Sequence, residues 1–273
     1  MTTMLLLRKV RLLAAYPRAV AAHPGAVLHY LLRDREFTNL TYEIENTDEL
    51  AAFVAEQLAK PLEEIEGYVS EPKRDAPFLR ELRAALETRD DRNDEPRFGR
   101  RLGWYAIVRA LRPELVVETG VHDGLGSALL LRALERNGTG RLMGFDMAAE
   151  SGWLVPTSLR DRYELVLGDV RETLPRELTG RRVDVFIHDS LHTYEHEHFE
   201  LALALEHGAE SLALVSDNAH ASEALSDLCR EHGLSYGLFR ERPRAHFYPG
   251  AGLGLAFRSA AATASTSSSV SSG

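Results

Sequence analysis

The chain has 273 residues, of which 44% are hydrophobic, so it can bury one large core, with or without an appended region. Its formal net charge of −9 argues against a nucleic-acid-binding surface. Cys229 is the only cysteine in the sequence, which excludes an intramolecular disulfide and a cysteine metal cluster. No apolar run in the sequence approaches the length of a membrane span, and we expect a cytoplasmic protein with no membrane partner.

The N-terminal segment is predicted to form short helices. Residues 1–36 alternate leucine-rich and basic patches, and Pro17 and Pro24 divide them into pieces. We expect these helices to pack on the rest of the protein, with a membrane-surface helix as the alternative. Residues 37–44 have the β-branched and aromatic content of a short strand or an extended link.

The next segment is helical and acidic. Residues 43–95 carry 16 acids against 7 bases, and residues 89–96 read as a polar linker that ends in proline. We therefore predict a helical N-terminal region over residues 1–95, which caps a pocket or forms a homodimer contact. Its apolar residues recur at helical spacing from Asn46 to Pro61, in 62–69 and in 78–86.

From residue 98 onward, short apolar strands alternate with helices. This alternation predicts a parallel sheet with helices on both faces, and two final strands without a helix between them imply one antiparallel member. We predict an α/β, Rossmann-like, doubly wound, mostly parallel sheet of seven strands over residues 96–258. A disordered Ala- and Ser-rich tail is predicted at 259–273. The predicted strands are 115–118, 142–146, 163–169, 183–189, 212–217, 235–240 and 252–258, and the longer helices are 104–111, 128–134, 194–206 and 222–231.

A glycine-rich turn joins the first of these strands to its helix. Gly120 allows a sharp turn and a close approach of the backbone to a ligand. Ser127 can cap the helix, where exposed amides suit a carboxylate. Dinucleotide-binding folds have the spacing G-x-G-x-x-G, whereas this loop runs G-x-x-x-G-x-G, with Glu118 two residues before its first glycine. The spacing disfavours a dinucleotide, and an ordinary strand-to-helix turn is the alternative interpretation.

Polar residues gather at the carboxyl ends of five predicted strands, where open α/β sheets bind their ligands. Asp146 ends the second strand, where a carboxylate can hold two ribose hydroxyls. Asp169 follows the third strand, where it can accept a hydrogen bond from an adenine amino group. Each of these residues could instead cap a helix or form a turn, but five such ends together indicate a binding site. The fourth and fifth ends carry His188, Asp189, Ser190, Leu191, His192, Ser216, Asp217 and Asn218.

From about Phe98 to Arg258 the chain resembles class I S-adenosylmethionine-dependent methyltransferases. It is most similar to the metal-dependent small-molecule O-methyltransferases of the catechol and caffeoyl-coenzyme A type, and to the metal-dependent sugar O-methyltransferases of antibiotic pathways. Residues 118–124 match E-x-G-x-x-x-G, residues 168–175 match G-[AD]-x-x-x-x-[LI]-P, and Asp217 with Asn218 matches the Asp-Asn metal pair of that group.

The resemblance implies S-adenosylmethionine as the cofactor and a small hydroxylated metabolite as the methyl acceptor, such as a natural product, a sugar or a phenol. It also implies a magnesium ion, because carboxylate and amide oxygens are hard ligands. The predicted metal ligands are Asp189, Asp217 and Asn218. The predicted cofactor-binding residues are Glu118, Gly120, His122, Gly124, Ser127, Asp146, Asp169 and Asp189.

The fourth strand end departs from the catechol type, whose general base is a lysine three residues after an aspartate ligand. His192 stands at that position here, and a histidine can accept a proton near neutral pH. The strand is one residue longer, so His188 could instead take the aspartate's place. We expect His192 and His188 to be the catalytic candidates, and an iron site of these two with Asp189 is a weaker alternative. His196 and His198 are expected on a solvated helix face.

Two other functions stay open. A nicotinamide-dependent dehydrogenase is disfavoured by the loop spacing and by the lack of a Tyr-x-x-x-Lys pair. A methyltransferase-like binding module without catalysis is disfavoured by the intact acids Asp146, Asp189 and Asp217.

Overall fold

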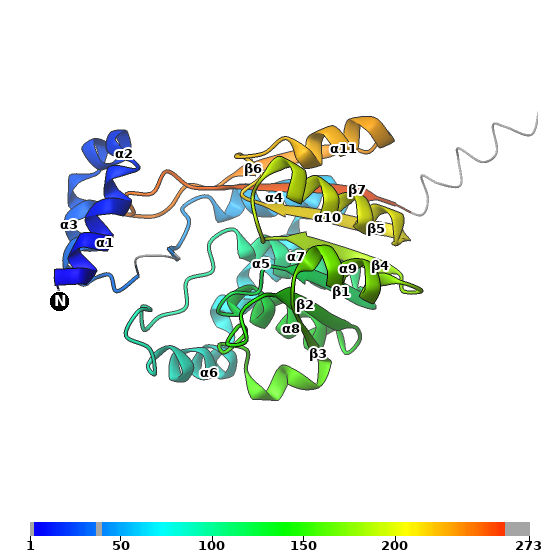
Figure 1. Ribbon diagram of the computed structural model, residues 1–273, viewed down its shortest axis with the longest axis horizontal. Helices are drawn as coiled ribbons and strands as arrows, with labels where there is room; N and C mark the ends of the chain where they lie inside the picture. The colour runs from blue at the N-terminus through cyan, green and yellow to red at the C-terminus, as the bar shows by residue number, and fades with distance from the viewer. Residues whose placement is uncertain (1–2, 37–39, 260–273) are drawn as a thin grey trace, which may run out of the picture.

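The computed structural model describes residues 3–36 and 40–259, and its centre is a seven-stranded sheet (Figure 1). The strands are β1 (Leu115–Thr119), β2 (Arg141–Asp146), β3 (Tyr163–Leu167), β4 (Val183–His188), β5 (Gly208–Asp217), β6 (Tyr236–Arg240) and β7 (Gly252–Arg258). They lie in the order β3-β2-β1-β4-β5-β7-β6. β1 to β5 pair in parallel, and β7 runs antiparallel to both β5 and β6. The predicted sheet and its antiparallel member are confirmed.

Helices cover both faces of this sheet, as predicted. Val116 and Ile187 face one cluster of buried residues, and Val117 and Phe186 face the other, because alternate strand residues point to opposite faces. Helices α4 (Thr47–Leu58), α5 (Leu62–Arg74), α6 (Ala76–Leu86), α7 (Arg101–Leu111) and α8 (Leu125–Asn137) contribute to the first cluster, and α9 (Val170–Leu178), α10 (Tyr194–Glu206) and α11 (Ala224–His232) to the second. The 3₁₀-helix η1 (Thr157–Arg162) precedes β3.

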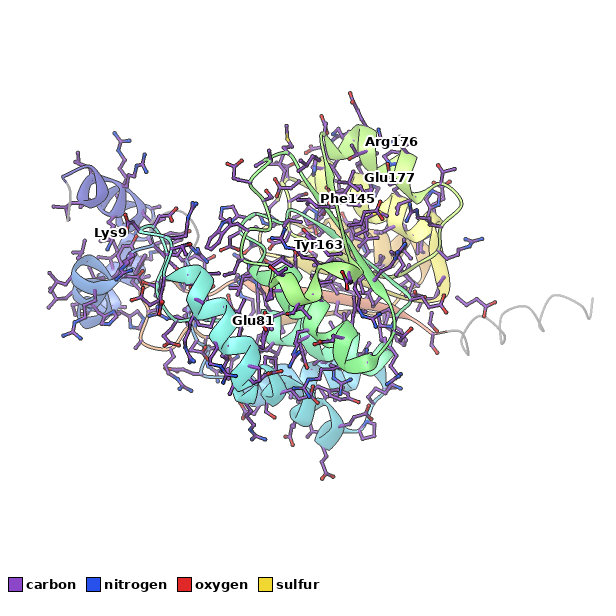
Figure 2. All side chains as sticks on the ribbon, turned by 90° about the horizontal axis from the view of Figure 1, so that it is seen from below. Lys9, Glu81, Phe145, Tyr163, Arg176 and Glu177 are labelled. Atoms are coloured by element: carbon purple, nitrogen blue, oxygen red, sulfur yellow. The ribbon has the colours of Figure 1, made fainter. Side chains whose placement is uncertain are left out.

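The first three helices stand apart from the sheet at the N-terminal side of the molecule (Figure 1). They are α1 (Thr3–Ala14), α2 (Pro17–Ala22) and α3 (Pro24–Arg33), so both prolines begin a helix, where a missing amide hydrogen does no harm. Lys9, labelled in Figure 2, is buried and donates hydrogen bonds to the carbonyls of Tyr30 and Asp34. A small cluster around Tyr30 and Phe247 joins these helices to the β6–β7 connection.

Two of the predicted segments fall partly outside the described residues. Of the predicted link at 37–44, residues 40–44 carry an isolated antiparallel bridge, from Ile44 to Pro243, rather than a strand. The predicted tail lies beyond the described chain except for Ser259, and the domain division at residue 95 stays a prediction. Within residues 3–36 and 40–259, the structure contains no helix with the length and apolar character needed to cross a membrane.

The strand order places the candidate residues at one edge of the sheet. β1 lies between β2 and β4, so the chain winds outward in opposite directions from this point, and such switch points are where α/β sheets bind ligands. Thr119 pairs with His188, and His188 pairs with Ser216. The residues that follow, namely Gly120, Asp189 and Asp217, are therefore neighbours.

Candidate functional site

Gly120 is required by the close approach of the β1 and β4 ends. Its φ of 85° lies in the left-handed region, and a Cβ atom there would be 2.1 Å from the carbonyl oxygen of Asp189. The amide of Asp189 donates to the carbonyl of Thr119 at 2.9 Å, which fixes the two ends together. The glycine is therefore needed because the backbone that follows the neighbouring strand β4 occupies the space of a side chain.

The larger cavity at this edge, which we call the glycine-loop pocket, has a volume of about 600 Å³. This lies within the range of small-molecule sites, roughly 300–1,000 Å³. Asp146 accepts hydrogen bonds from the amides of His122 at 2.8 Å and Ala148 at 2.9 Å. Burial alone would raise the pKa of Asp146, but these amides outweigh it and lower the pKa, so the carboxylate is charged at neutral pH. The pocket is lined by Thr119, Gly120, His122, Phe145, Asp146, Met147, Gly168, Asp169, Val170, Arg171, Asp189, Ser190, Leu191 and His196.

Three predicted cofactor residues do not line this pocket. Glu118, Gly124 and Ser127 are absent from the described residues that line it. The predicted cap by Ser127 is wrong, because Gly124 occupies the N-cap position and the buried Ser127 hydroxyl donates to the Glu118 carboxylate instead. Glu118 lies two residues after Val116 in β1, so its side chain is on the same face of the sheet, which α7 and α8 cover.

Glu118 is buried, and burial favours its protonated form. Burial raises the pKa of Glu118 to about 8, against the opposing effects of the Ser127 hydrogen bond and the Arg101 charge. The folded protein therefore keeps this proton up to about pH 8, whereas the unfolded chain loses it near 4.5. Because the folded state binds more protons in this window, the residue lowers the free energy of unfolding as pH rises through it.

We expect Glu118→Gln to remove this pH dependence. Relative to the variant, the wild type should lose on the order of 4 kcal/mol of unfolding free energy between pH 4.5 and 8, at about 1.4 kcal/mol per pKa unit. Urea unfolding of both proteins at several pH values measures the difference. Parallel pH profiles for the two proteins would contradict the assignment.

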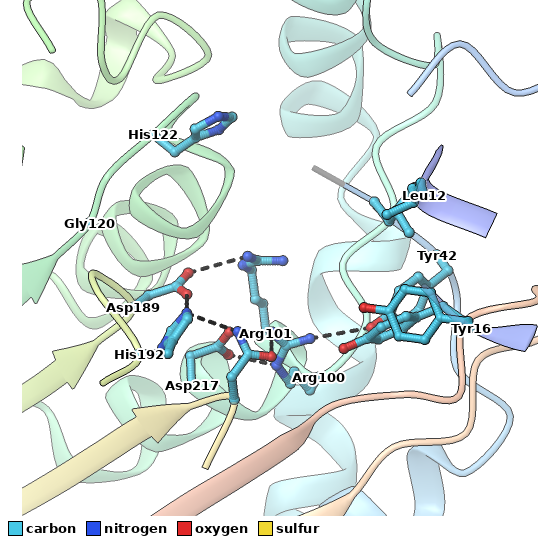
Figure 3. Close-up of a pocket in the computed structure, with 13 residues that line it drawn as sticks. Leu12, Tyr16, Tyr42, Arg100, Arg101, Gly120, His122, Asp189, His192 and Asp217 are labelled. Atoms are coloured by element: carbon cyan, nitrogen blue, oxygen red, sulfur yellow. Dashed lines mark hydrogen bonds and ion pairs between the residues drawn. The ribbon is translucent and has the colours of Figure 1, made fainter. Parts of the chain in front are cut away.

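A second cavity, the arginine pocket, adjoins the first and has a volume of about 350 Å³. It shares Gly120, His122 and Asp189 with the glycine-loop pocket. In Figure 3, Asp189 and His192 lie on one side, Tyr16 and Tyr42 on the other, and Arg100 and Arg101 between them. The remaining lining residues are Leu12, Leu40, Asp217, Asn218 and Tyr248.

Arg100 anchors the inner end of the arginine pocket. Its Nε donates to Asp217 Oδ1 at 2.6 Å and its Nη2 donates to Oδ2 of the same carboxylate. Its Nη1 donates to Glu241 at 2.9 Å. Burial alone would raise the pKa of Asp217, but the Arg100 charge and hydrogen bonds lower it to about 2. Asp189, by contrast, has its pKa raised by burial and by the neighbouring Asp217 charge.

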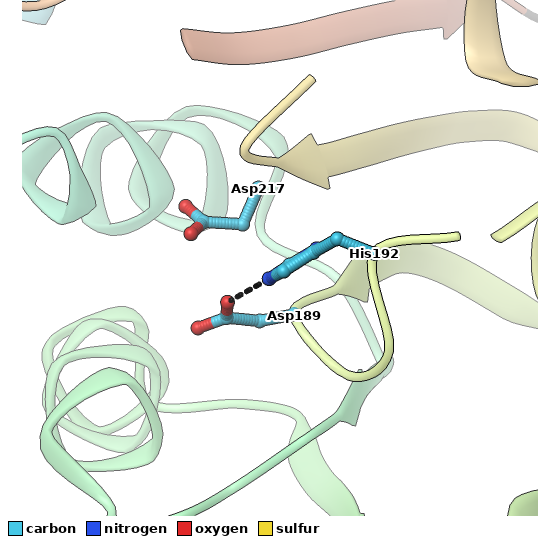
Figure 4. Close-up of side chains that lie close together, drawn as sticks. All are labelled: Asp189, His192 and Asp217. Carbon is cyan, nitrogen blue, oxygen red and sulfur yellow. Dashed lines mark ion pairs between the residues drawn. The ribbon is translucent and has the colours of Figure 1, made fainter. Parts of the chain in front are cut away.

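His192 lies between the two aspartates (Figure 4). Its Nε2 is 2.9 Å from Asn218 Nδ2 and 3.6 Å from Asp189 Oδ1. Arg100 Nη2 donates to Asn218 Oδ1 at 3.5 Å, which is consistent with the amide nitrogen of Asn218 pointing at His192. Since that nitrogen is a donor, Nε2 of a neutral His192 carries the lone pair. Burial lowers the pKa of His192, which favours the neutral ring.

His188 does not join this group, contrary to our expectation. Its side chain is fully buried, and its Nδ1 lies 2.6 Å from Glu200 Oε2 on α10. Among the described residues that line the two pockets His188 does not occur, and Asp189 is the residue beside Asp217 and His192. The expectation for His196 is also wrong, because it is buried, lines the glycine-loop pocket and pairs with Glu200 at 2.9 Å.

Several residues of the site were missed by the sequence analysis. Arg100 and Arg101 precede the predicted helix, and the only signal for them was a pair of adjacent cations at the start of an otherwise apolar segment. Glu241 follows β6, and the aromatic residues of the pocket wall come from segments where the pattern predicted only packing. Their partners lie far away in sequence: Asp217 is 117 residues from Arg100, and Asp189 is 88 residues from Arg101.

Comparison with known proteins finds similarity over the central part of the chain. A family model described as a methyltransferase domain matches residues 117–219, a span that runs from β1 to just beyond Asn218. Among solved structures, cofactor-bound Rv0187 from MTB is similar with a TM-score of 0.54 and 19% identity, covering 69% of this chain and 93% of that one. No sequence among curated proteins matches the chain.

An O-methyltransferase from Bacillus cereus, in complex with SAH, has a TM-score of 0.51 and 14% identity. It covers 77% of this chain and 99% of its own. At these identities the structural likenesses show the fold. Residues 117–219 match the methyltransferase-domain model, and the sheet that contains them has the fold of these solved structures.

Proposed function

We propose that this protein transfers the methyl group of S-adenosylmethionine to a hydroxyl oxygen of a small molecule. The observation that carries the proposal is the meeting of the two pockets at Gly120, His122 and Asp189. Methyl transfer is an in-line displacement that depends chiefly on the positions of the two reactants. The glycine-loop pocket has the size and acids for the cofactor, and the arginine pocket would hold the acceptor beside it.

His192 is the proposed proton acceptor. A hydroxyl is a weak nucleophile while it keeps its proton, so a base within hydrogen-bond reach raises the rate. His192 lines the arginine pocket beside Asp189, one of the residues that both pockets share. Asn218 Nδ2 donates to the Nε2 lone pair of the neutral ring, so the acceptor hydroxyl would replace this contact before Nε2 takes its proton.

The cofactor site is tested by Asp146→Ala. We expect the variant to lose on the order of 1–3 kcal/mol of affinity for S-adenosylhomocysteine, because a charged acceptor of the ribose hydroxyls is removed. Isothermal titration calorimetry measures this loss. Glu150→Ala makes the same charge change at an exposed position outside the glycine-loop pocket and should leave affinity unchanged. A wild type that binds neither S-adenosylmethionine nor S-adenosylhomocysteine would refute the cofactor assignment.

The reaction itself is tested by incubation with S-adenosylmethionine that carries an isotopically labelled methyl group. The acceptors are a panel of sugars, phenols and other hydroxylated natural products. Mass spectrometry should find the labelled methyl group on a hydroxyl oxygen of a panel member. Tight cofactor binding without a labelled product from any of them would favour the non-catalytic binding module.

The N-terminal region is proposed to close the acceptor site. Tyr16, between α1 and α2, and Tyr42 line the arginine pocket, and both rings contact Tyr248 of the β6–β7 connection, with centroids 5.3 and 5.7 Å away. We expect Tyr16→Ala to raise KM for the acceptor by about tenfold, because a ring that covers the acceptor is lost. Steady-state kinetics measures KM. An unchanged KM, or a parallel loss of S-adenosylhomocysteine affinity, would place Tyr16 outside the acceptor site.

The homodimer contact predicted for the N-terminal helices stays a prediction. In its favour, α1 and α3 expose several large apolar side chains, namely Leu6, Leu7, Val10, Leu28 and Leu32. Exposed apolar surface of this kind is a feature of protein interfaces.

A further inference from the structure

The predicted magnesium ligands are already bound to arginine side chains. Both carboxylate oxygens of Asp217 accept hydrogen bonds from Arg100, and the third nitrogen of that guanidinium pairs with Glu241. These three side chains are buried, with 8% of Arg100 and none of the two carboxylates exposed. Magnesium demands near-ideal octahedral coordination by oxygen. To coordinate it, Asp217 would have to give up its planar, bidentate pair with Arg100.

The charge of the cluster leads to the same conclusion. With every group ionised, Asp189, Asp217 and Glu241 carry three negative charges against the two positive charges of Arg100 and Arg101, so the cluster carries at most −1, and the raised pKa of Asp189 brings this charge closer to zero. A divalent cation would change the balance to at least +1 in a site where both guanidinium groups lie within hydrogen-bond distance of the proposed ligands. Asp189, His192 and Asp217 do place ligand atoms within 4.8 Å of one another. With the two arginines present, however, this set does not fit a magnesium ion.

Arg101 differs from Arg100 in being available to a ligand. Within the described chain its hydrogen bond is to Asp189, at 3.3 Å, and its guanidinium lies over the ring of Trp104 with 5.3 Å to the centroid. It lines the arginine pocket beside Gly120 and His192. A guanidinium has five N–H donors, so one contact to Asp189 leaves donors for an oxygen in that pocket.

We infer that Arg100 and Arg101 take the place of a divalent cation between Asp189 and Asp217, and that Arg101 donates a hydrogen bond to the acceptor oxygen. This inference rests on the proposed function. Arg100 is then a positioning residue, which holds Asp217 and Asn218, and Arg101 is a catalytic residue. His192 takes the hydroxyl proton, the oxygen forms a bond to the methyl carbon, and the carbon–sulfur bond breaks with its electron pair left on the sulfur. The positive charge of Arg101 stabilises the negative charge that develops on the oxygen.

The first experiment measures metal binding without turnover. Free Mn²⁺, a probe for magnesium sites, is followed by electron paramagnetic resonance during titration into wild-type protein and into Asp217→Asn. We expect no stoichiometric site in either protein. One Mn²⁺ bound per wild-type chain, and lost in Asp217→Asn, would overturn the inference whether or not a methyl acceptor has been found. This keeps its failure distinct from a failure of the proposed function.

The second experiment uses turnover with an acceptor from the labelled-methyl panel. Exhaustive chelation by EDTA should leave kcat within about twofold of its value with added Mg²⁺. Arg101→Met should lower kcat by about 100-fold, the usual effect of removing a donor to a developing oxyanion, and leave S-adenosylhomocysteine affinity unchanged. Arg83→Met, at a partly exposed arginine outside both pockets, is the matched control. Loss of turnover on chelation with recovery on added Mg²⁺, or an Arg101→Met enzyme as active as Arg83→Met, would contradict the roles assigned to the arginines.

Discussion

Replacement of Arg100 by methionine is expected to destabilise the folded protein by about 3–5 kcal/mol, the usual effect of removing one partner from a buried ion pair. The reason is that Asp217 and Glu241 are fully buried and share this guanidinium. Without it, two buried carboxylates would lose the cation that they share. Urea unfolding at pH 7 measures the loss.

The control for this prediction is Arg83→Met, which removes an exposed pair with Glu95 and should change stability by less than about 1 kcal/mol. Asp217→Asn and Glu241→Gln added to Arg100→Met should recover much of the lost stability, because the uncompensated charges are then gone. If Arg100→Met were no more destabilising than Arg83→Met, the buried network would not hold the inner end of the arginine pocket.

Replacement of His192 by alanine is expected to lower kcat by roughly 100-fold or more, the effect of a positioned proton acceptor. Affinity for S-adenosylhomocysteine should not change, because the described residues lining the glycine-loop pocket do not include His192. The residual rate should rise with pH as hydroxide takes over the proton. Steady-state kinetics and calorimetry on the same preparations separate the two effects.

His198→Ala is the matched control, since His198 stacks on Tyr194 and lies outside both pockets among the described residues. It should leave kcat unchanged. A His192→Ala enzyme that retains wild-type turnover would show that the proton leaves by another route, and would remove the proposed base without changing the reaction class.

The sheet and the polar strand ends were predictable from the sequence because their signals are local. The β-branched runs, the glycine turn and the acids that follow each strand lie within a few residues of one another, and parallel strands bring their carboxyl ends to one edge. For this reason Gly120, Asp146, Asp169 and Asp189 were placed at the edge that carries the pockets.

The face of the sheet on which a single side chain lies was harder to predict. His188 and Asp189 are adjacent, and one residue decides which of them turns toward α10 and which toward the pockets. Phe186 packs in the α9–α11 cluster, so alternation along β4 sends His188 to the same face, where Glu200 is its partner. This alternation assigns His188 to a face only if the end of β4 is known to within one residue. The sequence pattern does not fix the strand end that closely.

The arginine network could not be predicted, because each of its pairs joins distant segments. Arg100 precedes α7, Asp217 ends β5 and Glu241 follows β6. The contact between Arg100 and Asp217 forms because the fold brings the start of α7 close to the carboxyl end of β5. The magnesium expectation arose from a motif at Asp217 and Asn218 that carries no information about this third partner.

A crystal structure of the protein with S-adenosylhomocysteine tests the central claim most directly. We expect the ribose beside Asp146, the adenine near Asp169, and the sulfur at the junction formed by Gly120, His122 and Asp189, facing the arginine pocket. A cofactor bound outside the glycine-loop pocket, or one whose sulfur faces away from His192 and Arg101, would contradict methyl transfer between these two pockets.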